Sequence, residues 1–314
     1  MDPKVSILIP CYNSAAFIDE TIQCCIGQTY ANIEIVIVDD GSKDNSLEII
    51  RKYESDKVKI ISQTNLGACC ARNLAFQHCT GDYILYLDAD DVINSEFVAC
   101  HMCKLKPMDC RTISFCPWDR FYKTLDDAKF PHLNIYKDYD DAFQLLLDMW
   151  MTGNMLANSC YVIPKQLVIE SNGWNETILK NQDGEFFSRI LMLAHKALFI
   201  PDARTYYRTG SYDSVSKGTS YLKIRSFLDS LVLYKKNALN HENTERVKMA
   251  LAQNFSLFIY LYYNLYPDLC EIAKRETLDM GVSLLPAGPY KARVLSRLIG
   301  LEPFLKLKKF IKRK

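Results

Sequence analysis

The chain has 314 residues, of which 49% are hydrophobic and 24% charged, and its formal net charge is +1. This length predicts one large domain with a smaller appended region, and the composition excludes a disordered chain. A net charge near zero argues against a general nucleic-acid-binding protein, so we expect no nucleic-acid partner. The charge is unevenly distributed, because residues 291–314 hold nine Lys or Arg and one acid, a net of +8.

The N-terminus runs directly into a strand-like segment and lacks the charged and then apolar layout of a secretion signal. No apolar run approaches about 18 residues, the length that predicts a membrane-spanning helix. The twelve cysteines are therefore expected to be reduced thiols in a cytoplasmic protein. A zinc site built on Cys100, Cys103, Cys110 and Cys116 is disfavoured, because these residues include one close pair and lack a second.

The first ninety or so residues alternate short apolar strands with helices. Strands are predicted at 5–9, 33–38, 58–62 and 83–87, and helices at 15–28, 43–53 and 67–79. Alternation in units of about thirty residues predicts an α/β fold, a mostly parallel sheet with helices on both faces. Ligands bind at the carboxyl edge of such sheets, where the strands end.

The pattern is less regular after residue 109. Helices are predicted at 139–151 and 183–197, and a strand at 197–200. Beyond about residue 220 the segments are helical in pattern and are interrupted by prolines. We therefore expect a first domain at 1–217 and a helical C-terminal region at 218–314.

The strongest local signal is the acidic sequence Leu87-Asp88-Ala89-Asp90-Asp91, which directly follows an apolar strand. Three carboxylates within four positions repel one another, and a hard divalent cation such as Mg²⁺ or Mn²⁺ offsets that repulsion. An acidic loop or a helix cap is the alternative interpretation, and this motif alone does not separate the two.

Polar side chains follow the other predicted strands as well. A nucleotide requires an aromatic ring to stack on its base, an acceptor for a base N–H and a positive charge near its phosphates. Residues of these types follow the first three strands, namely Tyr12 and Asn13 in the segment that begins at Pro10, and then Asp39, Asp40, Asn65 and Arg72. The strand ends together therefore predict a nucleotide site.

These segments resemble the family 2 glycosyltransferases of the GT-A fold. The matching segments are, in order, 5–13, 37–42, 65–67, 71–73, 81–91 and 182–183. The resemblance covers about residues 4–215. It implies a nucleotide-diphospho-sugar transferase fold with a C-terminal helical extension. It also implies an inverting, metal-dependent enzyme that moves a sugar from a nucleotide-diphosphate donor, by family tendency a UDP-sugar, to a glycan or lipid-linked acceptor in cell-surface polysaccharide synthesis.

The resemblance also implies roles for single residues in the donor site. Tyr12 resembles the residue that packs on uracil, and Asp40 resembles the carboxylate that accepts the base N3–H. Asp39 is expected to position the same loop, with a simple turn-forming role as the alternative. Arg72 resembles the basic residue near the diphosphate, with an ordinary surface arginine as the alternative. The other donor-site residues implied are Pro10, Asn13, Asn65, Asp88 and Arg208.

Two further roles concern metal binding and proton transfer. Asp88 and Asp90 form the Asp-x-Asp motif expected to hold Mn²⁺ or Mg²⁺, with Asp90 in direct contact. Asp183 resembles the catalytic base, and its place at the start of a predicted helix favours an ionised carboxylate. The alternatives are a helix cap for Asp183 and, less favoured, Glu185 as the base. The family often has Glu at the position of Gln182.

Residues 206–208, followed by 211–216, resemble the segment that closes the catalytic domain in this family and approaches the diphosphate. The chain lacks a Gln-x-x-Arg-Trp sequence, which accompanies processive membrane synthases, so a non-processive enzyme is expected. Residues 294–314 interleave apolar and basic side chains, a pattern typical of a helix on an anionic membrane surface. This predicts a peripheral location on the inner face of the cell membrane, and a helix packed on the protein body is the alternative.

Two other functions remain open on the sequence. A sugar-phosphate nucleotidyltransferase would also bind a nucleotide and a metal, but it usually has a glycine-rich phosphate loop that residues 10–13 do not provide. A catalytically inactive nucleotide-sugar-binding module would keep the fold and lose turnover. The presence of every expected acid favours an active enzyme.

Overall fold

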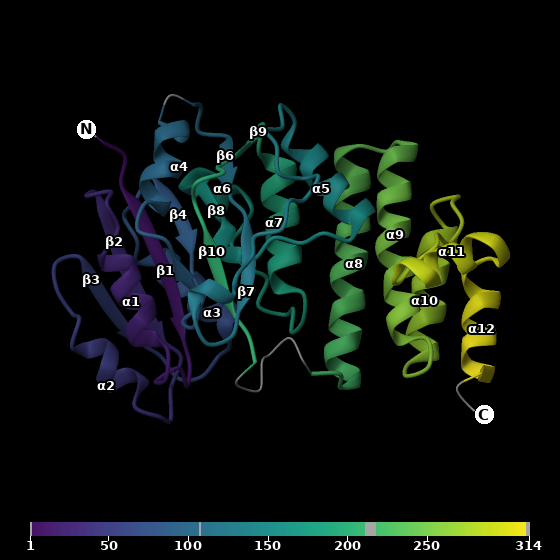
Figure 1. The fold of residues 1–314 in the computed structure, drawn as a ribbon, viewed down its shortest axis with the longest axis horizontal. Helices are drawn as coiled ribbons and strands as arrows, with labels where there is room; N and C mark the ends of the chain where they lie inside the picture. Colours follow the sequence, from purple (N-terminus) through teal and green to yellow (C-terminus); the bar gives the residue numbers. More distant parts are fainter. Residues whose placement is uncertain (1, 107, 211–217, 312–314) are drawn as a thin grey trace. The chain divides into compact units, whose positions relative to one another are not determined.

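The computed structural model describes residues 2–106, 108–210 and 218–311 (Figure 1). The chain divides into two compact units. The first comprises Met1–Leu145, Leu156–Glu176 and Arg189–Asp213, and the second comprises Leu146–Met155, Thr177–Ser188 and Ser214–Lys314. The domain boundary expected at residue 217 falls in the stretch 211–217, which lies outside the described residues.

The first unit is built on a seven-stranded sheet of order β3-β2-β1-β4-β8-β6-β9. Its strands are β1 (Val5–Cys11), β2 (Ile33–Asp39), β3 (Val58–Ser62), β4 (Tyr83–Tyr86), β6 (Thr112–Phe115), β8 (Tyr161–Pro164) and β9 (Lys196–Phe199). Strands β1 to β4 are parallel, whereas β8 is antiparallel to both of its neighbours. The prediction of a mostly parallel α/β sheet is confirmed.

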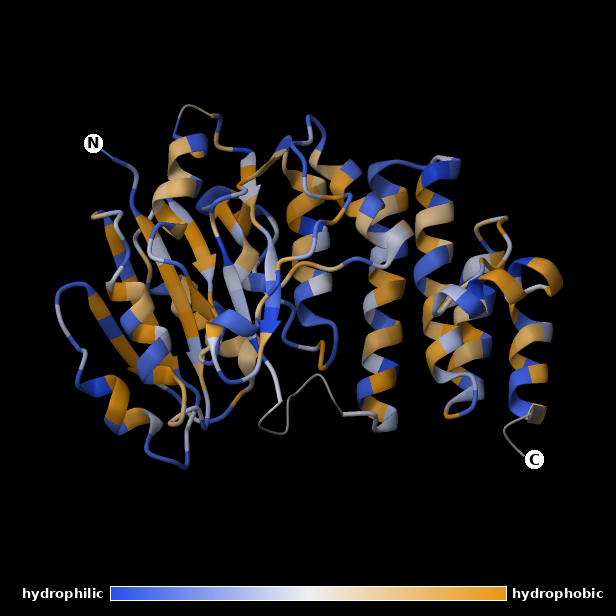
Figure 2. Cartoon of the chain, viewed as in Figure 1, coloured by the Kyte–Doolittle hydropathy of each residue, from blue (hydrophilic) through white to orange (hydrophobic). Residues whose placement is uncertain are grey.

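Strands β1 and β2 are buried along nearly their whole length, as Figure 2 indicates by their apolar colouring. Strands covered by helices on both faces read as continuous Val and Ile runs, because neither face meets water. The four predicted N-terminal strands are present. Strand β1 ends two residues later than expected, β2 one residue later and β4 one residue earlier.

The first unit also contains α1 (Ile18–Ile26), α2 (Ser46–Arg51), α3 (Ala68–Gln77), α4 (Phe97–Leu105) and α6 (Lys165–Glu170). The first three helices were predicted, but each is shorter at both ends. Before α1, the backbone N–H groups of Ser14 and Ala15 donate to Ser46 Oγ (2.7 Å) and Asp44 Oδ2 (3.0 Å). These donors tie the loop after β1 to the loop after β2, so the helix begins later than its apolar pattern predicts.

The strand order locates the place where ligands are expected. The connections from β1 to β2 and from β2 to β3 run one way across the sheet, and the connection to β4 returns to the other side of β1. Right-handed crossovers therefore place α1 and α2 on one face and α3 on the opposite face. The reversal creates a switch point between β1 and β4, the position at which open α/β sheets bind ligands.

A second, three-stranded sheet lies beyond β4 in the chain. Its order is β5 (Val92–Ile93), β10 (Thr205–Arg208), β7 (Trp118–Phe121), and Tyr206 pairs with Val92. Because β5 directly follows the acidic sequence, this pairing brings residues 205–208 next to that sequence. The expected continuation at 211–216 lies outside the described residues.

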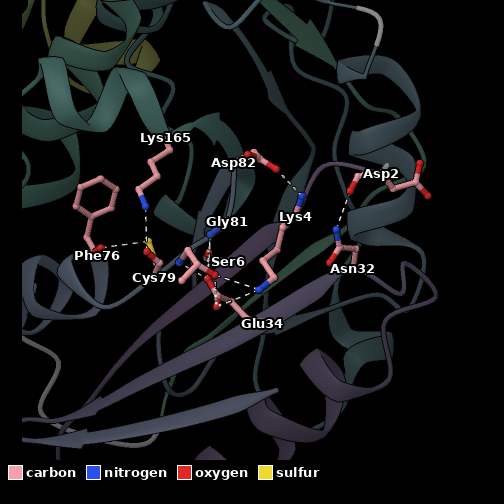
Figure 3. A network of polar contacts seen from close by, with 11 residues as sticks. Asp2, Lys4, Ser6, Asn32, Glu34, Phe76, Cys79, Gly81, Asp82 and Lys165 are labelled. Carbon is pink, nitrogen blue, oxygen red and sulfur yellow. Dashed lines mark hydrogen bonds and ion pairs between the residues drawn. The ribbon is translucent and has the colours of Figure 1, made fainter. Parts of the chain in front are cut away.

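A polar network joins the amino ends of β1, β2 and β4 (Figure 3). Glu34 accepts hydrogen bonds from Ser6 Oγ (2.6 Å) and Gly81 N (3.0 Å), and Lys4 Nζ lies 3.7 Å from its other oxygen. A Cβ atom on Gly81 would lie 2.8 Å from the backbone N of Ser6, so only glycine fits there. This edge of the sheet is opposite the switch point, and its polar groups hold the strands in register.

The C-terminal region is helical, as predicted. It contains α8 (Tyr221–His241), α9 (Glu245–Tyr262), α10 (Pro267–Leu278), α11 (Tyr290–Ile299) and α12 (Leu301–Ile311). Two further helices, α5 (Ala142–Thr152) and α7 (Gln182–Leu193), contribute residues to both units. None of the helices in the described part of the chain is both long enough and apolar enough to cross a membrane.

Candidate functional site

Tyr12 and Asn13 follow β1 at the switch point. Asn13 has a positive φ of 49° and links two loops, because its backbone N donates to Ser42 Oγ (3.0 Å) and its Oδ1 accepts from Lys43 N (2.8 Å). Tyr12 remains 42% exposed, so a planar base can stack on its ring. Pro10, the last of the predicted residues in this segment, is half-buried within β1.

Asp39 and Asp40 are both buried at the end of β2, but their carboxylates differ. Asp40 accepts hydrogen bonds from Gln63 Nε2 (2.6 Å), Leu66 N (2.8 Å) and Gly67 N (2.9 Å). Asp39 accepts one weak bond at Oδ2, and its buried Oδ1 has no hydrogen-bond partner among the described residues. Buried polar atoms normally have a partner, so the open oxygen of Asp39 indicates an acceptor for a ligand N–H.

The loops after β2 and β3 approach each other closely. Gly41 has a φ of +72°, and a Cβ atom at this position would lie 2.8 Å from the backbone N of Asn65. Glycine is therefore required at position 41, both by the positive φ and by the lack of space for a Cβ atom. Asn65 and the neighbouring Leu66 are exposed beside this contact, on the same edge of the sheet as Asp39.

Asp88 is held by two side chains through one of its oxygens. Arg72 Nη2 (2.8 Å) and Asn158 Nδ2 (2.9 Å) both donate to Asp88 Oδ1. Arg72 is only 4% exposed, and its guanidinium lies 4.3 Å from the ring centroid of Trp174. The structure therefore places Arg72 as a buried partner of Asp88, and the alternative of an ordinary surface arginine is excluded.

Asp90 and Asp91 concentrate negative charge beside Asp88. Burial, together with the Asp88 carboxylate, raises the pKa of Asp90 to about 6. Burial and both neighbouring carboxylates raise the pKa of Asp91 well above its ordinary value. Asp91 is fully buried and accepts hydrogen bonds from the backbone N of Arg208 (3.0 Å) and from Ser159 Oγ (3.4 Å). Asp91 therefore supports the cluster from the interior.

Arg208 on β10 also lies against the acidic cluster. Its Nε donates to the Asp90 carbonyl oxygen (2.9 Å), and its Nη2 pairs with Glu20 on α1. The guanidinium is 4.3 Å from the ring centroid of Phe121, and the side chain is 9% exposed. These contacts join β10 to the cluster and partly neutralise it.

Asp183 lies in the first turn of α7, within the second unit. The residue that precedes this turn, Asn181, has a φ of 67° and donates to Ser230 Oγ (2.9 Å) and Tyr234 Oη (2.7 Å) on α8. The start of α7 is thus fixed to α8. Glu185 is 3% exposed, which disfavours it as a base that must touch an acceptor. Asp183 is half-buried and has the more open position.

The structure brings together residues that were predicted separately, and adds others. Arg72 and Arg208 both donate hydrogen bonds to the acidic sequence, at Asp88 and at the Asp90 carbonyl oxygen, whereas Asp183 belongs to the second unit. Sequence analysis missed Asn158 and Trp174, which come from the irregular stretch 109–180. No local pattern marks either residue, since each acts through a contact distant in the chain.

The carboxylate oxygens of the acidic sequence suit a divalent cation that binds together with a diphosphate. Among the described residues, no group of three or more His, Cys, Asp or Glu side chains is arranged to hold a metal ion. Both donors to Asp88 use Oδ1, so Oδ2 and the Asp90 carboxylate remain as oxygen ligands. Mg²⁺ commonly takes one or two protein carboxylates and completes its shell with water and substrate phosphate. The residues present fit that pattern.

Residues 6–145 match the family model described as glycosyl transferase family 2. The chain is 27% identical to the glycosyltransferase GlyG of Streptococcus pneumoniae over 226 residues, which cover 67% of this chain and 72% of that protein. It is 28% identical to the cholesterol galactosyltransferase of Borreliella burgdorferi over 225 residues, which cover 67% of this chain and 62% of that protein.

The fold has a close counterpart among solved structures. S. aureus TarS 1–349, determined in complex with UDP-GlcNAc, superposes with a TM-score of 0.74 at 17% sequence identity, covering 99% of this chain and 92% of that chain. This likeness confirms the predicted fold, and the family match confirms the resemblance drawn from the motifs. Residues 6–145 belong to glycosyl transferase family 2, and the chain has the GT-A fold of these enzymes.

Proposed function

We propose that the protein is an inverting, non-processive glycosyltransferase that uses a UDP-sugar donor. One observation carries the proposal: the acidic sequence after β4 and the loops holding Tyr12 and Asp39 share the carboxyl edge of the sheet, around the switch point between β1 and β4. UDP is favoured because TarS, which has this fold, was determined in complex with UDP-GlcNAc.

On the donor side, the Tyr12 ring stacks on the base of the nucleotide. A buried carboxylate accepts a hydrogen bond from N3–H of that base. Asp40 was predicted for that bond, and it retains capacity at Oδ2, which accepts one donor. The partnerless Oδ1 of Asp39 makes Asp39 the stronger candidate, with Asp40 holding the loop after β3 in place. Arg72 acts on the diphosphate indirectly, through the orientation it gives to Asp88.

Asp88 and Asp90 would hold Mn²⁺ or Mg²⁺, which supplies positive charge to the leaving diphosphate when bound. On the acceptor side, Asp183 takes the proton from the attacking hydroxyl group. The oxygen forms a bond to the anomeric carbon as the bond to the diphosphate breaks on the opposite face. A single displacement of this kind inverts the anomeric centre, and UDP leaves with the negative charge.

We further propose a glycan or lipid-linked acceptor, in cell-surface polysaccharide synthesis at the inner face of the membrane. The name of the Borreliella relative gives a lipid, cholesterol, as what that protein acts on. The interleaved apolar and basic residues at the C-terminus favour the same location. A lipid-linked acceptor would lie at the membrane surface, within reach of a peripheral enzyme.

Thermal melting with nucleotides tests the donor site. We expect UDP with Mn²⁺ to raise the melting temperature by about 5 °C or more at saturating ligand, because a ligand stabilises the folded state that binds it. Asp90→Asn should lose this metal-dependent shift, and Asp39→Asn should lose the preference for UDP over GDP. The matched control is Asp56→Asn, which changes an exposed carboxylate before β3, at the opposite edge.

An equal shift in Asp90→Asn and in the natural protein would contradict the metal assignment. The products separate the remaining functions. A glycosyltransferase incubated with its donor slowly releases free UDP, a nucleotidyltransferase releases pyrophosphate from a nucleoside triphosphate and a sugar phosphate, and an inactive binding module releases neither.

A further inference from the structure

Helix α11 exposes its large apolar side chains and buries its small ones. Ala292 and Ser296 are 8% and 2% exposed, whereas Tyr290, Leu295 and Leu298 are 75%, 49% and 75% exposed. A helix that packs only on its own protein shows the reverse arrangement, because burial of large apolar side chains stabilises the fold most. Ala292 and Ser296 bring the helix close to the rest of the unit, while the large side chains remain available to another surface.

Helix α12 extends this surface and is anchored to the second unit. Leu301 and Leu305 are buried, whereas Leu307 is 50% exposed. Lys308 is fixed on α9, with Nζ 3.0 Å from the Tyr260 hydroxyl and 4.1 Å from its ring centroid. The two helices contact each other, and Figure 2 shows apolar and hydrophilic residues alternating along both. The exposed apolar residues therefore lie on two helices that contact each other and are fixed to the second unit.

Exposed basic side chains lie on the same two helices as the exposed apolar residues. The exposed cations on the two helices are Lys291, Arg293, Arg297, Lys306 and Lys309. The one acid of the segment, Glu302, is paired with Lys274 of α10 (2.7 Å). Within the described ranges, no acidic side chain forms an ion pair with any of the five exposed cations. The positive charge of the surface is therefore not compensated internally.

We infer that α11 and α12 form a docking surface for an anionic lipid membrane. Exposed leucines can enter the acyl boundary while the surrounding lysines and arginines meet anionic headgroups. A second copy of this surface would bring like charges together, so self-association through it is disfavoured. The inference extends the membrane location proposed above, and it rests on the proposed function only for the reason that the protein would bind a membrane. Binding to lipid itself requires neither the sugar donor nor the acceptor, so it can be tested separately from transferase activity.

Co-sedimentation with vesicles tests the surface on the full chain. We expect binding to vesicles of phosphatidylcholine with phosphatidylglycerol, little binding to phosphatidylcholine alone, and weaker binding as salt is added. Leu298→Glu should weaken binding by about tenfold, because it removes a large apolar contact and adds a negative charge. Replacing Lys306 and Lys309 together by Glu should weaken it by at least as much.

Leu222→Glu is the matched control, since Leu222 is 71% exposed but belongs to α8 and not to the docking surface of α11 and α12. It should bind vesicles like the natural protein. Equal weakening by Leu222→Glu and Leu298→Glu, or equal binding to both kinds of vesicle, would overturn the inference. Absence of vesicle binding would also overturn it, and sedimentation velocity would then show whether Leu298→Glu instead breaks a dimer. Melting temperatures of the variants should be unchanged, because every substituted side chain is exposed.

Discussion

Asn158 illustrates at the residue scale how the acidic cluster is positioned. It is 1% exposed, its Nδ2 donates to Asp88 and its Oδ1 accepts from Ser159 N (2.7 Å). Asn158→Ala removes one of the two donors to Asp88 Oδ1, and a hydrogen bond to a charged group contributes about 1.5–3 kcal/mol. We expect UDP with Mn²⁺ to bind about tenfold more weakly by calorimetry. Asn240→Ala on α8 is the exposed control, and an unchanged affinity in Asn158→Ala would show that Arg72 alone orients Asp88.

Sequence analysis predicted the residues that follow a strand and missed those that support them. Asp88 and Asp90 were predictable because carboxylates after a buried strand stand out locally. The pairing of Arg72 with Asp88 was not, since a motif gives a residue type without its burial or its partner. The open oxygen of Asp39 depends on the geometry of a whole loop, which no spacing in the sequence specifies.

At the element scale, the amino edge of the sheet depends on one carboxylate. Burial raises the pKa of Glu34, but hydrogen bonds from Ser6 and Thr80 and the nearby Lys4 outweigh it, and the net pKa is lowered. Ionised Glu34 therefore stabilises the fold above its unfolded pKa of about 4.3, and this stability is lost as pH falls through the lower folded value.

Glu34→Gln should accordingly reduce the free energy of unfolding by about 1–2 kcal/mol at neutral pH. The difference from the natural protein should shrink below about pH 4, where Glu34 becomes protonated in both states. Urea unfolding at several pH values measures both effects, and exposed Glu54→Gln is the control. A difference independent of pH would mean that the bonds, and not the charge, hold this edge.

The predicted elements are those whose pattern is strong over several residues. Strands β1 to β4 carry continuous apolar runs and were found with small errors at their ends. Strands β5, β6, β7, β8 and β10 escaped prediction, since each has at most four residues. Strand β5 has two residues, and Trp118–Phe121 in β7 has no apolar run. Such short strands form through pairing with distant segments, so tertiary contacts decide their conformation.

At the scale of the whole molecule, the two units should respond differently to the donor. Hydrogen exchange with and without UDP and Mn²⁺ should show protection after β1, β2 and β4, because ligand binding suppresses local opening where it makes contacts. Helices α9 and α10, which carry none of the proposed donor residues, should exchange at an unchanged rate. Equal protection throughout both units would indicate global stabilisation and would argue against a donor site confined to the sheet edge.

The contact between the loops after β2 and β3 has a consequence for engineering this scaffold. Asp40 holds the backbone at Leu66 and Gly67, and Gly41 leaves space for Asn65. Neither loop has a conformation of its own that a transplanted segment could reproduce alone. A chimera meant to alter base selectivity therefore has to take both loops from the same parent protein. With loops from two different parents, the carboxylate after β2 would no longer meet the backbone amides after β3 that donate to it.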